Sequence, residues 1–320
     1  MVLYERTIDE VDPLAWDRFV VASGGSFLGS WNVIRAEGLL TPLRIFELYD
    51  ATSGLRSKIG QCAVAVSFDR VRFLDRLHLL PAHEAAWATS LRCIVDRCGR
   101  CFYTYGSPWN AEGRCLSSLC AAFPWARVTD AATGIDAVNF ARCADFAAYR
   151  RAISENIRRD YKKAALASPS VAIRRGVSAC RDIAGLVGLR RQVMRRNEEP
   201  FSTLIDAPLH ALKLLCMGDD ALIATVRAGG RSEAAFFGVR FGGRICYISG
   251  GTRDRCDGFG SYLFLTLIER WFAEHPGGAL YLGVTEPIVE PDPYTYGNLL
   301  YRRKLRGASI PSTAFNLDTR

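Results

Sequence analysis

The chain has 320 residues, which is enough for two domains of ordinary size. Hydrophobic residues make up 49% of the chain and charged residues 23%, a balance that is ordinary for a soluble globular protein. The first ten residues are polar rather than leader-like, and no apolar run is long enough to cross a bilayer. We therefore expect a cytoplasmic protein without membrane insertion.

The formal net charge is +8, and only five of the 41 basic residues are lysines. A positive field attracts polyanions such as CoA, nucleotides or tRNA. The arginine excess is also what a GC-rich genome would produce. The charge therefore favours a phosphate-bearing partner without selecting one.

Eleven cysteines raise the question of metal binding, because Cys93, Cys98 and Cys101 have the spacing C-x4-C-x2-C. The first two fall in a predicted helix and the third opens a predicted strand, so their side chains should point in different directions. Free cysteine is among the most buried residue types. We predict reduced, partly buried thiols, no metal and no structural disulfide.

The first part of the chain reads as one mixed α/β unit. Its expected helices cover 16–21, 31–37, 82–98 and 116–122, and its expected strands cover 43–49, 58–68, 101–105 and 138–141.

The rest of the chain repeats this plan as a second mixed unit. Its expected helices cover 146–167, 181–196, 209–217, 261–274 and 296–305, and its expected strands cover 171–175, 221–228, 233–241, 244–250 and 280–284, with an extended end near Phe315. We predict an α/β (α+β) chain of two domains, 1–141 and 142–320.

Four segments carry a resemblance to a known family: SFLGSW at 26–31, SENIRRDYKKA at 154–164, GFGSYLFLTLIERW at 258–271 and GNLLYRRKLRG at 297–307. With these segments the chain resembles the FemAB-like branch of the GNAT superfamily. The resemblance implies two GNAT-like mixed-sheet domains in tandem. It also implies an N-acyltransferase whose acceptor, an amine-bearing small molecule or peptide, binds in the cleft between the domains.

A glycine-rich loop points to the donor site. The string Arg255-Cys256-Asp257-Gly258-Phe259-Gly260 matches the GNAT pattern R/Q-x-x-G-x-G/A between a strand and a helix that continues with Ser261. Glycines let backbone N–H groups approach a pyrophosphate, and the helix N-terminus adds positive charge. The alternative is a glycine turn that only caps the helix.

The resemblance leaves two donors open. GNAT enzymes with this loop use acyl-CoA, which we take as the first choice. FemAB-type enzymes that build peptide bridges use aminoacyl-tRNA, and the Gly260-Ser261-Tyr262 helix start is of their type. A non-catalytic binding module with a GNAT fold is a further alternative.

Candidate substrate-binding residues come from two of the family-like segments. Arg158, Arg159, Lys162 and Lys163 share one helical face, where they would hold a phosphate or carboxylate of the acceptor, or an RNA backbone. A solvated face is the alternative. The resemblance adds Trp31 of the first segment.

Acyl transfer to an amine requires a base, an oxyanion site and a proton for the leaving group. Glu286, which follows a predicted strand, is the expected base. The resemblance suggests Tyr301 as the acid that protonates the thiolate, with Tyr296 or Tyr294 in its place if the helix is offset.

Two further features concern the oxyanion site and the choice of chemistry. Gly250 and Gly251, at the end of a strand, are expected to offer backbone N–H groups to the thioester carbonyl. All four histidines, His78, His83, His210 and His275, lie outside the family-like segments. No Ser-His-Asp set is visible, so hydrolase chemistry is disfavoured.

Overall fold

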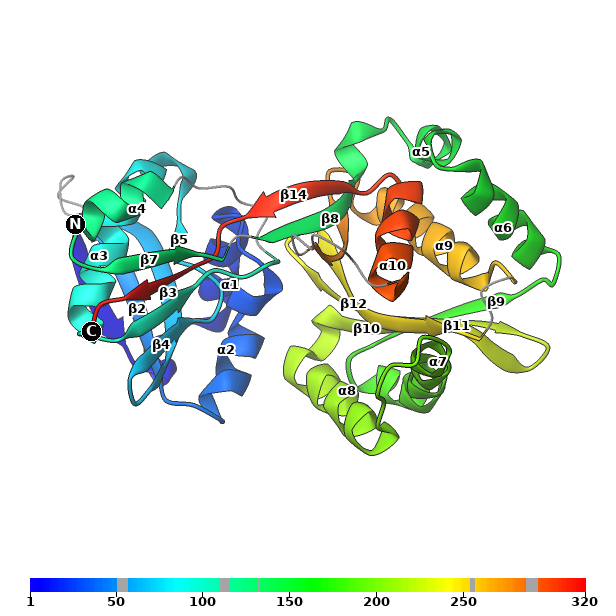
Figure 1. The fold of residues 1–320 in the computed structure, drawn as a ribbon, viewed down its shortest axis with the longest axis horizontal. Coiled ribbons are helices and arrows are strands. Elements are labelled where there is room, and N and C mark those ends of the chain that lie inside the picture. Colours follow the sequence, from blue (N-terminus) through cyan, green and yellow to red (C-terminus); the bar gives the residue numbers. More distant parts are fainter. Residues whose placement is uncertain (51–56, 110–115, 132, 254–256, 286–292) are drawn as a thin grey trace. The chain divides into compact units, whose positions relative to one another are not determined.

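The computed structural model describes residues 1–50, 57–109, 116–131, 133–253, 257–285 and 293–320. It divides the chain into two compact units, Met1–Ile135 with Ile310–Arg320, and Asp136–Ser309 (Figure 1). Each unit is built around a mixed sheet with helices on both faces. The predicted fold class, α/β with two mixed sheets in tandem, is confirmed.

The first unit holds a sheet with the strand order β1-β2-β3-β4-β6-β15-β7, in which β5 also pairs with β3. Its pairs are antiparallel except β4 with β6. The strands are β1 (Val2–Arg6), β2 (Leu43–Asp50), β3 (Ser57–Ser67), β4 (Arg70–Phe73), β5 (His78–Leu79), β6 (Phe102–Tyr105), β7 (Arg127–Asp130) and β15 (Phe315–Asp318). The helices are α1 (Pro13–Ala22), α2 (Trp31–Gly38), α3 (Trp87–Cys98) and α4 (Leu116–Ala122).

The second sheet has the order β14-β8-β13-β12-β11-β10-β9. Its strands are β8 (Thr133–Asn139), β9 (Ser170–Arg175), β10 (Ala221–Ala228), β11 (Arg231–Phe241), β12 (Arg244–Thr252), β13 (Ala279–Thr285) and β14 (Ala308–Ser312). The helices are α5 (Phe146–Ala152), α6 (Glu155–Ala165), α7 (Ile183–Arg196), α8 (Thr203–Met217), α9 (Phe259–Glu274) and α10 (Pro293–Lys304). Helices α5, α6, α9 and α10 cover one face of the sheet, and α7 and α8 cover the other (Figure 1).

Each face of this second sheet has its own apolar core. Phe236 and Trp271 lie in the core under α9, where both are at most 1% exposed. Phe237, the next residue of β11, points to the opposite core under α7 and α8. This alternation is the two-residue period of a strand that is buried on both faces. It fixes which side chains of β12 can reach each helix layer.

The end of the chain belongs to the first unit, not to the second as the 142–320 assignment supposed. Strand β15 pairs with both β6 and β7, and Phe315 and Leu317 are each 1% exposed. The hydrogen bonds to two neighbouring strands and the burial of two side chains hold β15 in the first sheet, although β14, the preceding strand in the sequence, belongs to the second. The extended segment predicted near Phe315 is therefore a central strand of the first sheet.

Leu317→Ala should lower the free energy of unfolding by about 2 kcal/mol, because it removes buried methyl groups from a filled core. Asn316→Ala, on the half-buried face of the same strand, is the control and should change stability by at most about 0.5 kcal/mol. Urea denaturation of the full chain measures both. Equal effects of the two variants would contradict the central position of β15.

The helix predicted over 146–167 is two helices, α5 and α6, separated by Ile153 and Ser154. Ile153 is extended, with φ −69° and ψ 163°, and its side chain is buried. The Ser154 N–H donates to the Lys304 carbonyl oxygen at 3.1 Å. The break therefore attaches α6 to the end of α10, a long-range contact that helical periodicity does not reveal.

The cysteine motif has the predicted local structure. Cys93 and Cys98 lie on α3, Cys101 directly precedes β6, and all three are half-buried. Burial raises the pKa of the Cys98 thiol to about 11, as expected for an inert thiol. Within the described ranges no three His, Cys, Asp or Glu side chains are placed to share a metal ion. The absence of a metal stays a prediction.

None of the helices in the described part of the chain is long and apolar enough to span a membrane.

Candidate active site

The site is built around a separation of two parallel strands. Strands β12 and β13 pair only at Arg244–Cys246 with Ala279–Tyr281, although both strands continue, β12 to Thr252 and β13 to Thr285. A β-bulge lies at the same point, because Gly238 pairs with Tyr247 while Phe237 pairs with Ser249, which leaves Ile248 as the extra residue. Bulges bend a strand and often lie beside active sites. The second half of β12 thus turns one backbone edge toward the gap.

Gly250 supplies a backbone donor at this edge. The Arg253 N–H donates to the Glu233 carbonyl oxygen at 2.8 Å, which makes these two residues a hydrogen-bonded antiparallel pair. Such pairs alternate along a ladder, so Gly251 directs its N–H toward β11 and Gly250 directs its N–H away from β11. Of the two predicted glycines, Gly250 therefore suits a carbonyl ligand in the gap.

Gly251 has a different reason for being glycine. A Cβ atom there would lie 2.6 Å from the Leu189 carbonyl carbon and 2.7 Å from the Arg190 nitrogen, both in the backbone of α7. The absence of a side chain lets α7 approach the strand closely. Its role in this structure is packing.

Helix α9 begins at the predicted loop. Gly258 is its N-cap residue with φ 75°, and a Cβ atom there would lie 2.2 Å from the Asp160 carbonyl oxygen of α6. Gly260 is in the first turn, where, among the atoms of the described residues, a Cβ atom would approach only the Thr252 Cγ2 atom, at 3.0 Å. Gly258 is thus required for the contact between α6 and α9, whereas no backbone atom of the described residues crowds the position of a Cβ atom at Gly260. Arg255 lies outside the described residues.

Tyr301 of α10 lies over the first turns of α9. Its ring meets Phe264 edge-on with centroids 5.8 Å apart, and its hydroxyl is buried without a normal hydrogen bond to any described residue. Burial raises the pKa of this hydroxyl well above its ordinary value, and the neighbouring Ser261 hydroxyl offsets part of that rise. Tyr301 is therefore a neutral O–H donor with no hydrogen-bond acceptor of normal geometry among the described residues.

Tyr247 connects Tyr301 with Gly250. A Cβ atom on Gly250 would lie 2.8 Å from the Tyr247 hydroxyl oxygen, and Tyr247 is close enough to Tyr301 to raise the pKa of its hydroxyl. Gly250 of β12 and the Tyr301 hydroxyl therefore both lie near Tyr247, on the face of the sheet that α9 covers. Ser261, buried at 5% exposure, completes it.

The structure does not place the other predicted site residues, Glu286, Tyr296 and Trp31, at this site. Glu286 lies outside the described residues. Tyr296 is in the first half of α10, and its side chain is outside the described part of the chain. Trp31 is only 7% exposed in the core of the first unit, where its ring lies 5.8 Å from that of Trp16, so its position is explained by packing.

The basic residues of α6 divide into two kinds. Arg158 is half-buried, and its Nε has no hydrogen-bond partner among the described residues. Arg159 and Lys162 are exposed. Because Asp160 of the same helix touches Gly258, this basic helix lies beside the N-terminus of α9. Helix α6, which carries these residues, therefore packs against the N-terminus of α9 through the Asp160 backbone.

Sequence reasoning missed a polar group on the opposite face of β12. The Nε2 atom of His210, on α8, is 2.7 Å from the Ser249 Oγ atom. Its Nδ1 atom is 2.7 Å from the carbonyl oxygen of Asp206 and 3.5 Å from the Asp206 carboxylate. No Ser-His-Asp set was visible in the sequence, because Ser249 lies 39 residues from His210. The structure brings Ser249 and His210 together, with the Asp206 backbone carbonyl rather than its carboxylate as the hydrogen-bond partner of Nδ1. The only local signal was the i, i+4 spacing of Asp206 and His210, and Asp206 lies before the helix predicted over 209–217, whereas α8 begins at Thr203.

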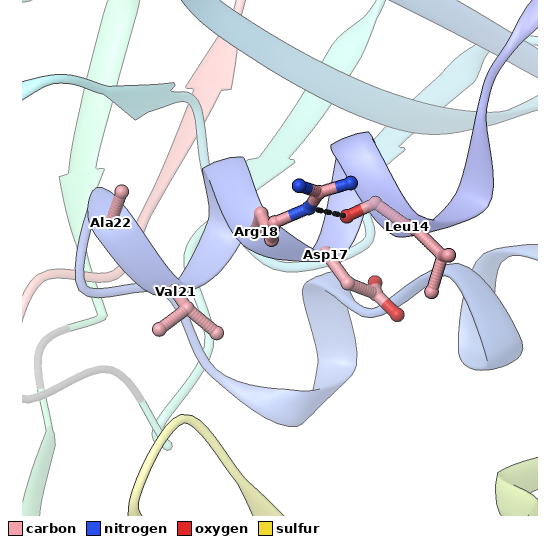
Figure 2. A pocket seen from close by; sticks show the side chains of 5 residues that line it. All are labelled: Leu14, Asp17, Arg18, Val21 and Ala22. Atoms are coloured by element: carbon pink, nitrogen blue, oxygen red, sulfur yellow. Dashed lines mark hydrogen bonds between the residues drawn. The ribbon is translucent and has the colours of Figure 1, made fainter.

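A shallow hollow runs along α1 in the first unit, lined by Leu14, Asp17, Arg18, Val21 and Ala22 (Figure 2). Burial raises the pKa of the Asp17 carboxyl, and the N–H of Trp31 donates to it at 2.6 Å. Arg18 turns back to donate to the Leu14 carbonyl oxygen at 3.2 Å (Figure 2). One helix supplies all the lining, and its two charged groups are engaged locally, so the hollow does not resemble a catalytic site.

Comparison with known proteins gives the following matches. The family model described as acetyltransferase (GNAT) domain matches residues 147–282. A search of curated proteins found no match. Among solved structures, FemX is similar with a TM-score of 0.72 at 9% identity, covering 98% of this chain and 96% of FemX.

Two other solved structures are similar over almost their whole length. A tandem GNAT protein from the clavulanic acid biosynthesis pathway has a TM-score of 0.53 at 13% identity, covering 99% of this chain and 97% of that protein. L-PGS from Bacillus licheniformis has a TM-score of 0.55 at 13% identity, covering 97% of this chain and 92% of that one. At such identities the likeness concerns the fold.

Proposed function

From the premise that this chain has a FemAB-like fold of the GNAT superfamily, with a GNAT acetyltransferase domain over residues 147–282, we propose that it transfers an acyl group from acyl-CoA to an amine. The acceptor in this proposal is an amine-bearing small molecule or a peptide. The observation that carries the proposal is the separation of β12 from β13, with the Gly250 N–H directed into the gap.

The Gly250 N–H would hold the thioester carbonyl. A backbone donor in a fixed strand needs no reorganisation when negative charge develops on that oxygen. Removing one oxyanion-hole donor costs about 2.7–4 kcal/mol of transition-state stabilisation in an acyl-transferring protease, so a single N–H in the right position would contribute substantially to the rate. The alternation of the β11–β12 ladder directs this donor away from β11.

Tyr301 would protonate the departing thiolate. Its buried hydroxyl is neutral because its pKa is raised, and no described residue accepts its proton in a hydrogen bond of normal geometry, which would leave the proton for the thiolate. The N-terminus of α9, where Gly260 has no side chain, would bind the pyrophosphate of the donor through backbone N–H groups and the helix dipole. Arg255 is proposed to add a side-chain contact there, and Glu286 remains a proposed base.

A second candidate is transfer from aminoacyl-tRNA. The exposed Arg159 and Lys162 of α6, together with the half-buried Arg158, support it because they lie beside the N-terminus of α9, where a nucleic-acid backbone would contact them. The similarity to FemX also favours keeping this candidate.

The two donors are distinguished by one assay. The full chain is incubated with acetyl-CoA and a panel of primary amines, and free thiol is measured against a reaction without amine. In parallel, radiolabelled aminoacyl-tRNA replaces acetyl-CoA. Amine-dependent thiol release supports the CoA proposal, and transfer only from tRNA moves the second candidate to first place. Specific CoA binding without turnover would favour the non-catalytic binding module.

A further inference from the structure

The group formed by Ser249, His210 and Asp206 has no role in the reaction as proposed above. It lies at the start of the same β12 segment that carries Gly250, but on the face covered by α7 and α8. Ser249 is 8% exposed and His210 is 2% exposed, so the serine is the outer member of the pair. His210 is held in place by the Phe237 ring, with centroids 5.2 Å apart at 71°.

The hydrogen bonds fix which nitrogen of neutral His210 carries the proton. The Asp206 carbonyl oxygen, 2.7 Å from Nδ1, can only accept, so Nδ1 must be the N–H donor. Nε2 then has no proton and accepts from the Ser249 hydroxyl at 2.7 Å. This is the tautomer in which an imidazole takes a proton from a hydroxyl group.

The surroundings keep His210 ready to accept a proton. Burial lowers the pKa of His210, and Arg190 on α7 and Lys213 on α8 lower it further, while Asp206 acts in the opposite direction. Asp206 is itself held by Arg190, whose Nε and Nη2 atoms lie 2.9 and 3.2 Å from its carboxylate oxygens. The carboxylate can therefore stabilise an imidazolium without taking its proton.

We propose that Ser249 and His210 form the proton relay that deprotonates the amine acceptor, with Asp206 as the residue that positions His210. This inference rests on the proposed N-acyl transfer. Ser249 is the group that would touch the acceptor, one residue before the Gly250 N–H that holds the carbonyl. His210 acts through it from inside the core.

The ammonium group of the acceptor gives a proton to Ser249 Oγ while Ser249 gives its own proton to His210 Nε2. The neutral amine forms the C–N bond, and collapse of the adduct breaks the C–S bond. The thiolate takes a proton from Tyr301 as the nitrogen releases its second proton, which restores the tyrosine. The proton on His210 returns to solvent through Ser249.

Two variants separate a relay from a structural hydrogen bond. His210→Gln can still accept a hydrogen bond from Ser249 but cannot take its proton, and Ser249→Ala removes the link. With acetyl-CoA and benzylamine, which is an ammonium ion near neutral pH, both variants should lower kcat/KM by about 100-fold or more, a loss within the range for general-base catalysis. The KM for acetyl-CoA should change little. Each variant removes a buried hydrogen bond and should therefore lower stability by about 1–3 kcal/mol, so the kinetics are measured at a temperature at which thermal unfolding shows both variants to be folded.

The same variants are then tested with aniline, which is already neutral at this pH. The relay predicts that the loss shrinks to a few-fold with aniline, and that raising the pH recovers part of the benzylamine activity. Equal losses with both amines, or full activity of His210→Gln, would overturn the relay while leaving the acyl transfer intact. A wild-type protein that transfers no acyl group to either amine would overturn the relay together with the proposed function.

Discussion

Gly258→Ala is expected to lower the free energy of unfolding by about 3–5 kcal/mol, or to prevent folding of the second unit. The left-handed conformation costs an alanine about 1–2 kcal/mol. In addition, its Cβ atom would lie 2.2 Å from the Asp160 carbonyl oxygen, a backbone atom that moves only if α6 moves away from α9. Such overpacking costs about 1–3 kcal/mol more.

Gly277→Ala is the matched control, because no atom of the described residues lies within 4 Å of a Cβ atom at that position. Urea or thermal unfolding of the two variants and the wild type measures the difference. A Gly258→Ala protein as stable as Gly277→Ala would show that α6 does not lie on the N-terminus of α9.

Tyr301→Phe is expected to lower kcat about 100-fold or more, the lower limit for loss of a general acid, with little change in the KM for acyl-CoA. Stability should be unchanged or slightly higher, because the lost hydroxyl is buried without a normal hydrogen bond to any described residue. Because the pKa of Tyr301 is raised, the tyrosine stays protonated over the range from about pH 6 to about pH 9. Wild-type kcat should therefore not fall through deprotonation of Tyr301 in this range.

Tyr149→Phe provides the opposite pattern within the same core. The Tyr149 hydroxyl donates to the Leu305 carbonyl oxygen at 2.8 Å, so its removal should cost about 1–2 kcal/mol of stability and leave kcat unchanged. Steady-state kinetics and thermal unfolding of both variants give the comparison. Equal kcat in wild type and Tyr301→Phe would remove Tyr301 from the mechanism.

Local patterns predicted much of the second unit. The hydrophobic periods and turn residues placed β10, β11, β12, α9 and β13 close to their observed bounds. The loop motif was found because its signal is contained within a few residues. The motif could not reveal that Gly258 is needed for contact with Asp160, because that contact joins segments about a hundred residues apart.

Features that depend on distant partners were not predictable in the same way. β15 joins the first sheet through β6 and β7, and no periodicity in a four-residue strand specifies those partners. The pairing of His210 with Ser249 depends on how α8 lies against β12, which is decided by packing. Trp31 was predicted as a substrate-binding residue because it lies in a family-like segment. Its burial in the core of the first unit indicates that the motif there reflects packing.

The most direct test of the central claim is isothermal titration of CoA into the wild type, Gly260→Val and Gly277→Val. If the N-terminus of α9 binds the pyrophosphate, wild type should bind CoA, Gly260→Val should bind it at least about 10-fold more weakly, a loss of about 1.4 kcal/mol, and Gly277→Val, at the other end of α9, should bind as the wild type does. Thermal unfolding checks that both variants fold. Equal affinity in all three proteins, or no CoA binding by the wild type, would contradict acyl-CoA as the donor.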